Sequence, residues 1–140
     1  KNLDFEIVDC AAPIRGDDWL VGELVRNLLA NAIRHTPQDG RLGIVIAAAD
    51  AAGTSYRLRV WDTGGGIRHT SLERVFEPFS SSFSATGSGL GLAICKEIAD
   101  LFGAEISVHN RDENGVPIGL EVCAVFSAAP TAGLPPVTTV

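Results

Sequence analysis

The chain has 140 residues, of which 46% are hydrophobic and 20% are charged, and its formal net charge is -6. This length suits one domain with a single core, and the composition is that of a folded globular protein. The chain lacks the basic footprint with which proteins bind nucleic acids or anionic lipid. Any site for an anionic ligand therefore has to be built locally, from backbone amides, a metal ion or a few polar side chains.

Membrane and redox signals are weak. The longest apolar run, Leu42 to Ala49, is far shorter than the roughly 20 residues that span a bilayer, so no transmembrane helix is expected. No signal-like pattern follows Lys1, so we expect a fragment of a longer protein whose anchor lies outside it. Cys10, Cys95 and Cys123 lack the spacing of zinc or redox sites, and we expect reduced, buried thiols.

The first half of the chain is predicted to form strands at Leu3 to Val8, at Leu42 to Ala49 and at Tyr56 to Trp61. In the third strand one face is predicted to be buried and the other to point outward. The buried positions are Tyr56, Leu58 and Val60, continued by Asp62, and the outward positions are Arg57, Arg59 and Trp61. Asp17 and Asp18 are predicted to begin a helix that Thr36 and Pro37 end at about His35. Its core stripe is expected to contain Leu20, Val21, Leu24, Leu28 and Ala32.

The second half begins with a long connection rich in Gly, Ser and Thr, Gly64 to Ser88, which is typical of a functional lid. A short helix around Leu72 to Val75 is expected inside it. A helix from about Gly89 to Phe102 should end at Gly103 and bury Ala93 or Ile94, Ile98 and Leu101. Two strands follow, at Glu105 to His109 and at Leu120 to Phe126.

This order of elements predicts an α+β fold. We expect a two-layer α/β sandwich, in which a mixed sheet of about five strands carries about three helices on one face and a flexible lid. The proline-rich end of the chain has too little large apolar content to pack. We therefore predict a folded domain at residues 1–127 and a disordered tail at residues 128–140.

Two asparagines mark one face of the first helix. Asn27 and Asn31 lie one turn apart, at the edge of the stripe formed by Leu24 and Leu28. Half-buried asparagines need hydrogen-bond partners or a ligand, and their amide oxygens suit a hydrated magnesium ion. Taken alone, the pair is better explained as two satisfied structural side chains.

A carboxylate precedes the first glycine cluster. Asp62 leaves a strand at a buried position and enters Gly64, Gly65 and Gly66. A buried carboxylate needs a hydrogen-bond donor, and the exocyclic amine of adenine is one candidate. The alternative interpretation is that this segment is an ordinary hairpin turn. Further on, Gly87, Gly89 and Gly91 open a helix whose free amides suit a phosphate, without matching the Walker or dinucleotide-binding patterns.

The segments NLLANAIRHTP, DTGGGI, FEPF and GSGLGL, in this order, resemble the N, G1, F and G2 boxes of sensor histidine kinases. These kinases belong to the superfamily that includes DNA gyrase, heat-shock chaperone and mismatch-repair ATPases. The resemblance covers about Leu3 to Phe126. It implies a Bergerat-type fold with an ATP lid, and ATP and Mg²⁺ as the bound groups.

By this resemblance Asn31 is the main magnesium ligand, Asn27 lies toward the phosphates, and Asp62 binds the adenine amine directly and through water. The catalytic residues implied are Asn27 and Asn31. The other nucleotide-binding residues implied are Arg34 and His35 at the phosphate or ribose, Gly64, Gly66 and Ile67 at the adenine, Phe76 and Phe79 as anchors of the lid, and Gly87, Ser88, Gly89, Leu90 and Gly91 in the lid itself.

The sequence also departs from related patterns. Gyrase-like relatives place a water-activating glutamate where this chain has Asn27, which disfavours fast hydrolysis but permits transfer to a histidine. Glu23, one turn earlier, is expected to be solvated or salt-bridged. Relative to the kinases, the lid segment SSSFSAT lacks a common basic residue, Leu120 replaces a common threonine and Ala104 a common glycine.

The resemblance implies the ATP-binding catalytic domain of a two-component sensor histidine kinase. His35, His69 and His109 lie in no acceptor motif, so the fragment should not phosphorylate itself. The implied partners are the phosphoacceptor and dimerisation domain of the same kinase and the receiver domain of a response regulator. We expect a monomeric fragment, and a homodimeric intact kinase in the bacterial inner membrane with this domain in the cytoplasm.

Two other hypotheses remain. The chain could be a degenerate interaction module that no longer holds ATP, although Asn31, Asp62 and the glycines are retained. It could also be a serine kinase or hydrolytic ATPase of the same fold, such as an anti-sigma-factor kinase, although Asn27 disfavours the gyrase type.

Overall fold

The computed structural model describes residues 3–8, 13–14, 18–66, 74–77, 91–128 and 138–139. Within these residues, a five-stranded sheet has the order β1-β3-β4-β6-β5. β1 runs parallel to β3, and every other neighbouring pair is antiparallel, so the predicted mixed sheet is confirmed. The strands are β1 (Asp4–Val8), β3 (Arg41–Ala48), β4 (Ser55–Asp62), β5 (Glu105–Glu113) and β6 (Val116–Ser127).

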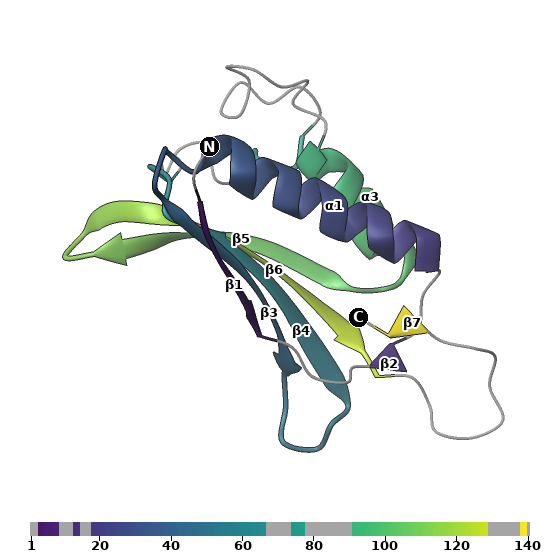
Figure 1. The fold of residues 1–140 in the computed structure, drawn as a ribbon. Helices are drawn as coiled ribbons and strands as arrows, with labels where there is room; N and C mark the ends of the chain where they lie inside the picture. The colour runs from purple at the N-terminus through teal and green to yellow at the C-terminus, as the bar shows by residue number, and fades with distance from the viewer. Residues whose placement is uncertain are drawn as a thin grey trace, which may run out of the picture.

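Two helices, α1 (Asp18–His35) and α3 (Gly91–Leu101), lie side by side on one face of this sheet (Figure 1). Their apolar faces meet the helix-facing strand residues in one core, and Leu24 of α1, Leu58 of β4 and Cys95 of α3 are almost completely buried there. The two-layer α/β sandwich predicted from the sequence is confirmed. Within the described residues, no helix has both the length and the apolar character to cross a membrane.

Both helices end where the sequence predicts. The backbone N–H and the side-chain hydroxyl of Thr36 both donate to the carbonyl of Ala32, and Pro37 cannot continue the helix. At the end of α3, Gly103 has a φ of 65°, and the N–H of Ala104 donates to the carbonyl of Ala99 at 2.8 Å. This arrangement is a Schellman motif, in which a left-handed glycine closes the helix.

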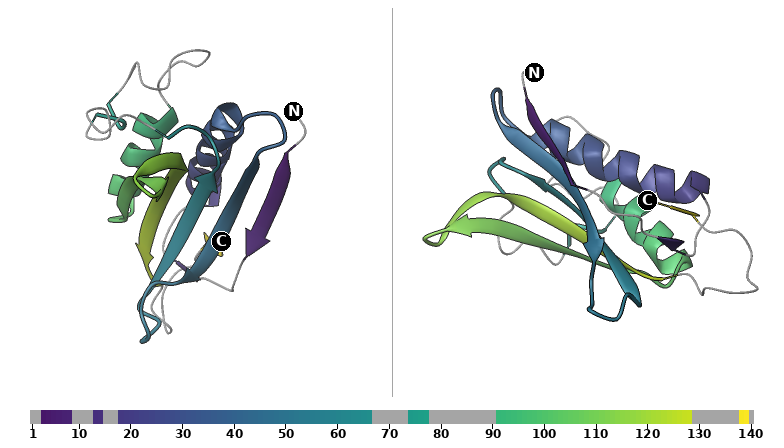
Figure 2. Two further views of the ribbon diagram at one scale, coloured as in Figure 1. Left: turned by 90° about the vertical axis from the view of Figure 1, so that its left-hand side faces the viewer. Right: turned by 60° about the horizontal axis from the view of Figure 1, so that its bottom comes forward.

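The hairpin of β5 and β6 is longer than predicted and extends beyond the helices (Figures 1 and 2). Its turn is Asn114-Gly115, with φ angles of 52° and 80°. Positive φ at both central residues is the geometry of a type I′ turn, which Asn-Gly strongly favours. Both predicted strands are therefore too short on the side of the turn, although Asn114-Gly115 is a recognisable hairpin signal in the sequence.

Some packing predictions were wrong. Leu101, predicted in the core of α3, is 70% exposed, because the buried side of the helix runs through Leu92, Cys95 and Ile98. Of the two predicted alternatives Ala93 and Ile94, Ala93 is the buried one, at 9% exposed. Trp61, at an outward position of β4, is only 8% exposed, because its ring packs against Gly43 and is covered by the guanidinium of Arg111. Around the short helix expected near Val75, residues 72–73 lie outside the described residues, and residues 74–76 form a turn.

Near the ends of the chain, β2 (Pro13–Ile14) pairs antiparallel with β7 (Thr138–Thr139). This pairing departs from the predicted disordered tail at those two residues, and the division at residue 127 stays a prediction. Cys95 and Cys123 are free and buried, as expected, and burial raises the pKa of each thiol to about 12. Cys10 lies outside the described residues.

Candidate nucleotide site

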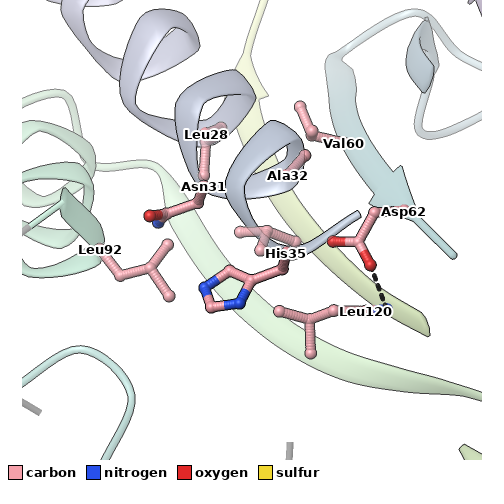
Figure 3. Close-up of a pocket in the computed structure, with 9 residues that line it drawn as sticks. Leu28, Asn31, Ala32, His35, Val60, Asp62, Leu92 and Leu120 are labelled. Atoms are coloured by element: carbon pink, nitrogen blue, oxygen red, sulfur yellow. Dashed lines mark hydrogen bonds between the residues drawn. The ribbon is translucent and has the colours of Figure 1, made fainter. Parts of the chain in front are cut away.

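A pocket lies between α1, α3 and the sheet, near the end of β4 (Figure 3). Three polar side chains reach it, Asn31 and His35 from α1 and Asp62 from β4. The rest of the lining is apolar and consists of Leu28, Ala32, Val60, Leu92, Leu120 and Val122. An apolar slot with a few convergent polar groups is the usual form of a site for a small organic ligand.

Among the described residues that line this pocket, Asp62 supplies the only carboxylate, and it is 4% exposed. Its Oδ1 accepts the backbone N–H of Gly64 at 2.8 Å and that of Leu120 at 3.3 Å. Because both bonds fall on Oδ1, the other oxygen is turned toward the pocket (Figure 3). The site therefore offers a fixed acceptor at the end of an apolar slot.

One effect raises the pKa of the Asp62 carboxyl, and three effects lower it. Burial raises the pKa of the carboxyl above its ordinary value, because the charged form loses hydration. The amides of Gly64 and Leu120 and the charge of Arg111 act in the opposite direction. A further donor supplied by a ligand would stabilise the ionised carboxylate in the same way.

Gly64 joins Asp62 to the end of α1. A β-carbon at this position would overlap the backbone carbonyl of His35 and come within 3.1 Å of Asp62 Oδ1. Glycine at this position therefore allows the end of β4 to lie against the end of α1. Gly66 adopts a φ of 71° and lies against the β5–β6 hairpin, where a β-carbon would meet Asn110 Oδ1 at 2.6 Å.

The two asparagines lie on the side of α1 that the spacing predicts. Asn31 is 7% exposed, and Gly91, the first residue of α3, lies against it, with an ideal β-carbon 3.3 Å from Asn31 Oδ1. Asn27 is half-buried, and its Nδ2 donates to the carbonyl of Glu23 at 2.9 Å. This bond uses the amide nitrogen, so the amide oxygen of Asn27 is the atom left for another partner.

The structure brings together only part of the predicted site. Asn31, His35 and Asp62 line the pocket, and Gly64 and Gly91 lie against these residues. Arg34 is half-buried in the last turn of α1. Phe76 is partly buried against the core, next to the fully buried Val75. The remaining predicted contacts lie outside the described residues, namely Ile67, Phe79, Gly87, Ser88, Gly89 and Leu90.

Two neighbours of the site were missed in the sequence. Arg111 donates from Nη1 to the backbone carbonyl of Asp62 at 3.0 Å, and a β-carbon at Gly119 would overlap that same carbonyl oxygen. Counting strand pairs back from the Asn-Gly turn would have placed Arg111 near this end of the sheet. A bulge in the hairpin shifts the register, so the contact itself carried no sequence signal.

The chain matches the family of histidine kinase-, DNA gyrase B- and HSP90-like ATPases over residues 16–126. It is 34% identical over 130 residues to the sensor protein CreC of Escherichia coli K12, covering 91% of this chain and 27% of that protein. The chain thus spans about a quarter of the length of this curated relative.

Solved structures agree with this match. The mycobacterial sensor histidine kinase MprB superposes with a TM-score of 0.82 at 32% identity, covering 92% of this chain and 86% of that one. Full-length ShkA in complex with AMPPNP superposes with a TM-score of 0.76 at 25% identity, covering 94% of this chain and 27% of that one. The resemblance predicted from the four motifs is confirmed, and an ATPase domain of this kind implies ATP binding. The chain belongs to the family of histidine kinase-, DNA gyrase B- and HSP90-like ATPases, and its fold is that of a sensor histidine kinase catalytic domain.

Proposed function

We propose that the chain is the ATP-binding catalytic domain of a two-component sensor histidine kinase. It transfers the γ-phosphoryl group of ATP to a histidine on a separate dimerisation domain, from which the group passes to the receiver domain of a response regulator. The observation that carries this proposal is the pocket itself, where the buried carboxylate of Asp62 faces an apolar slot and Asn31 lies on the adjoining helix.

In this proposal Asp62 recognises the adenine base. The oxygen that the two backbone amides leave available accepts the exocyclic amine of the base. Leu28, Val60 and Leu120 give the base an apolar surface, and Gly64 removes a side chain that would collide with the end of α1. The base is thereby recognised at one edge and desolvated on its faces.

Asn31 and Asn27 belong to the phosphate side of the site. The described residues contain no cluster of three or more His, Cys, Asp or Glu side chains that could hold a metal. A magnesium ion that keeps its waters and binds phosphate oxygens needs few protein ligands, so the amide oxygens of Asn31 and Asn27 fit it. The chemistry it would supply is neutralisation of the phosphate charge during transfer. We propose Arg34 and His35 as further contacts on this side.

Transfer is favoured over hydrolysis because the helix lacks a suitably placed base. Asn27 stands where gyrase-like relatives carry a glutamate. Glu23 forms the predicted salt bridge, with its Oε1 2.9 Å from Arg26 Nη2, at a partly exposed position. The acceptor histidine would come from the dimerisation domain of a longer, homodimeric protein in the bacterial inner membrane, with this domain in the cytoplasm.

The test is calorimetric titration of the fragment with a nonhydrolysable ATP analogue, with and without magnesium, followed by phosphotransfer from ATP to an added dimerisation domain. We expect binding that magnesium strengthens, and label on the histidine of the added domain only. A folded fragment that binds no nucleotide would favour the degenerate module. Steady phosphate release without an acceptor would favour a hydrolytic ATPase.

A further inference from the structure

A second structured cluster lies on the face of the sheet opposite the helices. Its centre is Trp61, which is 8% exposed although it does not belong to the core beneath the helices. Its ring lies over Gly43 on the neighbouring strand, where a β-carbon would approach the ring atoms to 2.6 Å. The guanidinium of Arg111 covers the ring at 4.5 Å from its centroid, and that of Arg41 lies at 5.9 Å.

Arg111 connects this outer cluster to the pocket. The pairing of β4 with β6 ends at Trp61 and Glu121, so the carbonyl of Asp62 lies just past the ladder. Arg111 Nη1 donates to that carbonyl at 3.0 Å, in the place where a strand neighbour would otherwise donate. The same guanidinium is therefore fixed by the Trp61 ring and by the residue whose side chain enters the pocket.

The hairpin is shaped to permit this contact. Its register shifts between Arg111, which pairs with Gly119, and Asp112, which pairs with Pro117, leaving one extra residue on β6. Because Gly119 has no side chain, the Asp62 carbonyl can approach it closely, and the side chain of Arg111 can cross β6 toward Trp61.

We propose that Arg111 is a positioning residue for the nucleotide site, holding the Asp62 main chain from the face opposite the pocket so that the carboxylate stays aimed at the base. This inference rests on the proposed function for its ligand. On the β3 side, the same stretch is held because the N–H of Thr63 donates to the Arg41 carbonyl at 2.9 Å. Arg111 supplies the restraint on the β6 side through its bond to the Asp62 carbonyl.

The test compares Arg111→Met and Arg111→Lys with the control Arg57→Met. Arg57 is an exposed arginine of β4 that lies on the same face of the sheet as Trp61. ADP and GDP affinities are measured by calorimetry well below the melting temperature. Amide hydrogen exchange is followed at Gly64 and Leu120, whose N–H groups bind the Asp62 carboxylate. Guanine carries a carbonyl where adenine carries the amine, so the ADP-to-GDP ratio reports on the aim of the carboxylate.

We expect Arg111→Met to weaken ADP binding on the order of tenfold with little change for GDP, and to speed exchange at both amides. Arg111→Lys keeps a cation over the ring and should recover part of the loss, whereas Arg57→Met should match wild type. Unchanged selectivity and exchange in Arg111→Met would overturn the inference. If wild type binds neither nucleotide, the proposed function fails, and the exchange rates alone then decide whether Arg111 holds Asp62.

Discussion

The two polar parts of the pocket are built in different ways. Asp62 is held by Gly64, two residues away, and by two residues from distant parts of the chain, Leu120 on β6 and Arg111 on β5. Asn27 and Asn31 sit on a single helix, and the one hydrogen bond described for Asn27 goes to Glu23, four residues earlier. The position of the Asp62 carboxylate is thus set by packing between strands, whereas the positions of the two asparagines are set by their spacing along one helix.

This difference predicts where each part is vulnerable. Substitutions in β5 or β6 outside the pocket lining, such as at Arg111 or Gly119, should damage the carboxylate site, because they move the strand end that carries Asp62. Substitutions of the asparagines should change ligand binding while the fold stays intact. Variants that break one part and leave the other intact separate the two.

The largest effect is expected from Gly119→Ala. The added β-carbon would overlap the Asp62 carbonyl, so β4 and β6 would have to separate at their ends, at a cost of about 3 kcal/mol of unfolding free energy. Nucleotide affinity should fall with it. Chemical denaturation and calorimetry measure both effects.

The matched control is Gly65→Ala, because within the described part of the chain no atom beyond the adjacent residues lies within 4 Å of an ideal β-carbon there, and the φ of Gly65 is not positive. Its stability should stay within about 0.5 kcal/mol of wild type. Equal destabilisation by the two alanines would show that the close approach at Gly119 does not matter.

The second effect is expected from Asp62→Asn. The asparagine oxygen can still accept the amides of Gly64 and Leu120, but its NH₂ group then faces the amine of the base. Two opposed donors cost about 1–3 kcal/mol, or about a 5- to 150-fold loss in affinity. Calorimetry should show this loss in a protein that melts no earlier than wild type, and tight binding by this variant would argue against recognition at Asp62.

A smaller effect is expected from Asn31→Ala. Alanine favours the helix, so the unfolding free energy should change by no more than about 1 kcal/mol. The increase in nucleotide affinity on adding magnesium should disappear, because an amide oxygen that fits the ion is gone. Titrations with and without magnesium check this outcome, and an undiminished magnesium effect would remove Asn31 from the proposed metal site.

The smallest effect concerns pH. Burial raises the pKa of Asp62 above its ordinary 3.8, so the stability gained by protonation is present below that value and is lost as the pH rises through the raised pKa. The amide that replaces the carboxyl in the Asp62→Asn variant does not titrate. Acidification from neutral pH to about pH 4 should therefore stabilise wild type relative to this variant, as measured by urea denaturation. The opposite trend would mean that the amides and Arg111 outweigh burial.

Local patterns in the sequence predicted the parts of the fold that depend on them. The asparagine helix followed from its apolar stripe and from the stop at Thr36 and Pro37, and the end of α3 followed from Gly103. The buried position of Asp62 followed from strand alternation. These features depend on residues within a few positions of one another, which is where propensity and periodicity carry information.

Features that depend on strand register were missed. Trp61 was placed outward by alternation, but Gly43 and Arg111, on two other strands, cover it. The bulge that pairs Arg111 with Gly119 has no local signature, because it is set by how three strands meet at the end of the sheet. Leu101 was assigned to the core from spacing alone, which does not show where the packing of α3 against its neighbours ends.

The most direct test of the central claim pairs a change in the protein with a change in the ligand. Affinities of wild type and Asp62→Asn are measured for ADP and for purine riboside 5′-diphosphate, which lacks the exocyclic amine. If Asp62 accepts that amine, removing it should cost wild type about tenfold in affinity, whereas the variant should lose nothing and should regain affinity, because one of its two opposed donors is gone. An equal loss in both proteins would show that the amine and Asp62 do not interact, and would contradict the assignment of this pocket as the adenine site.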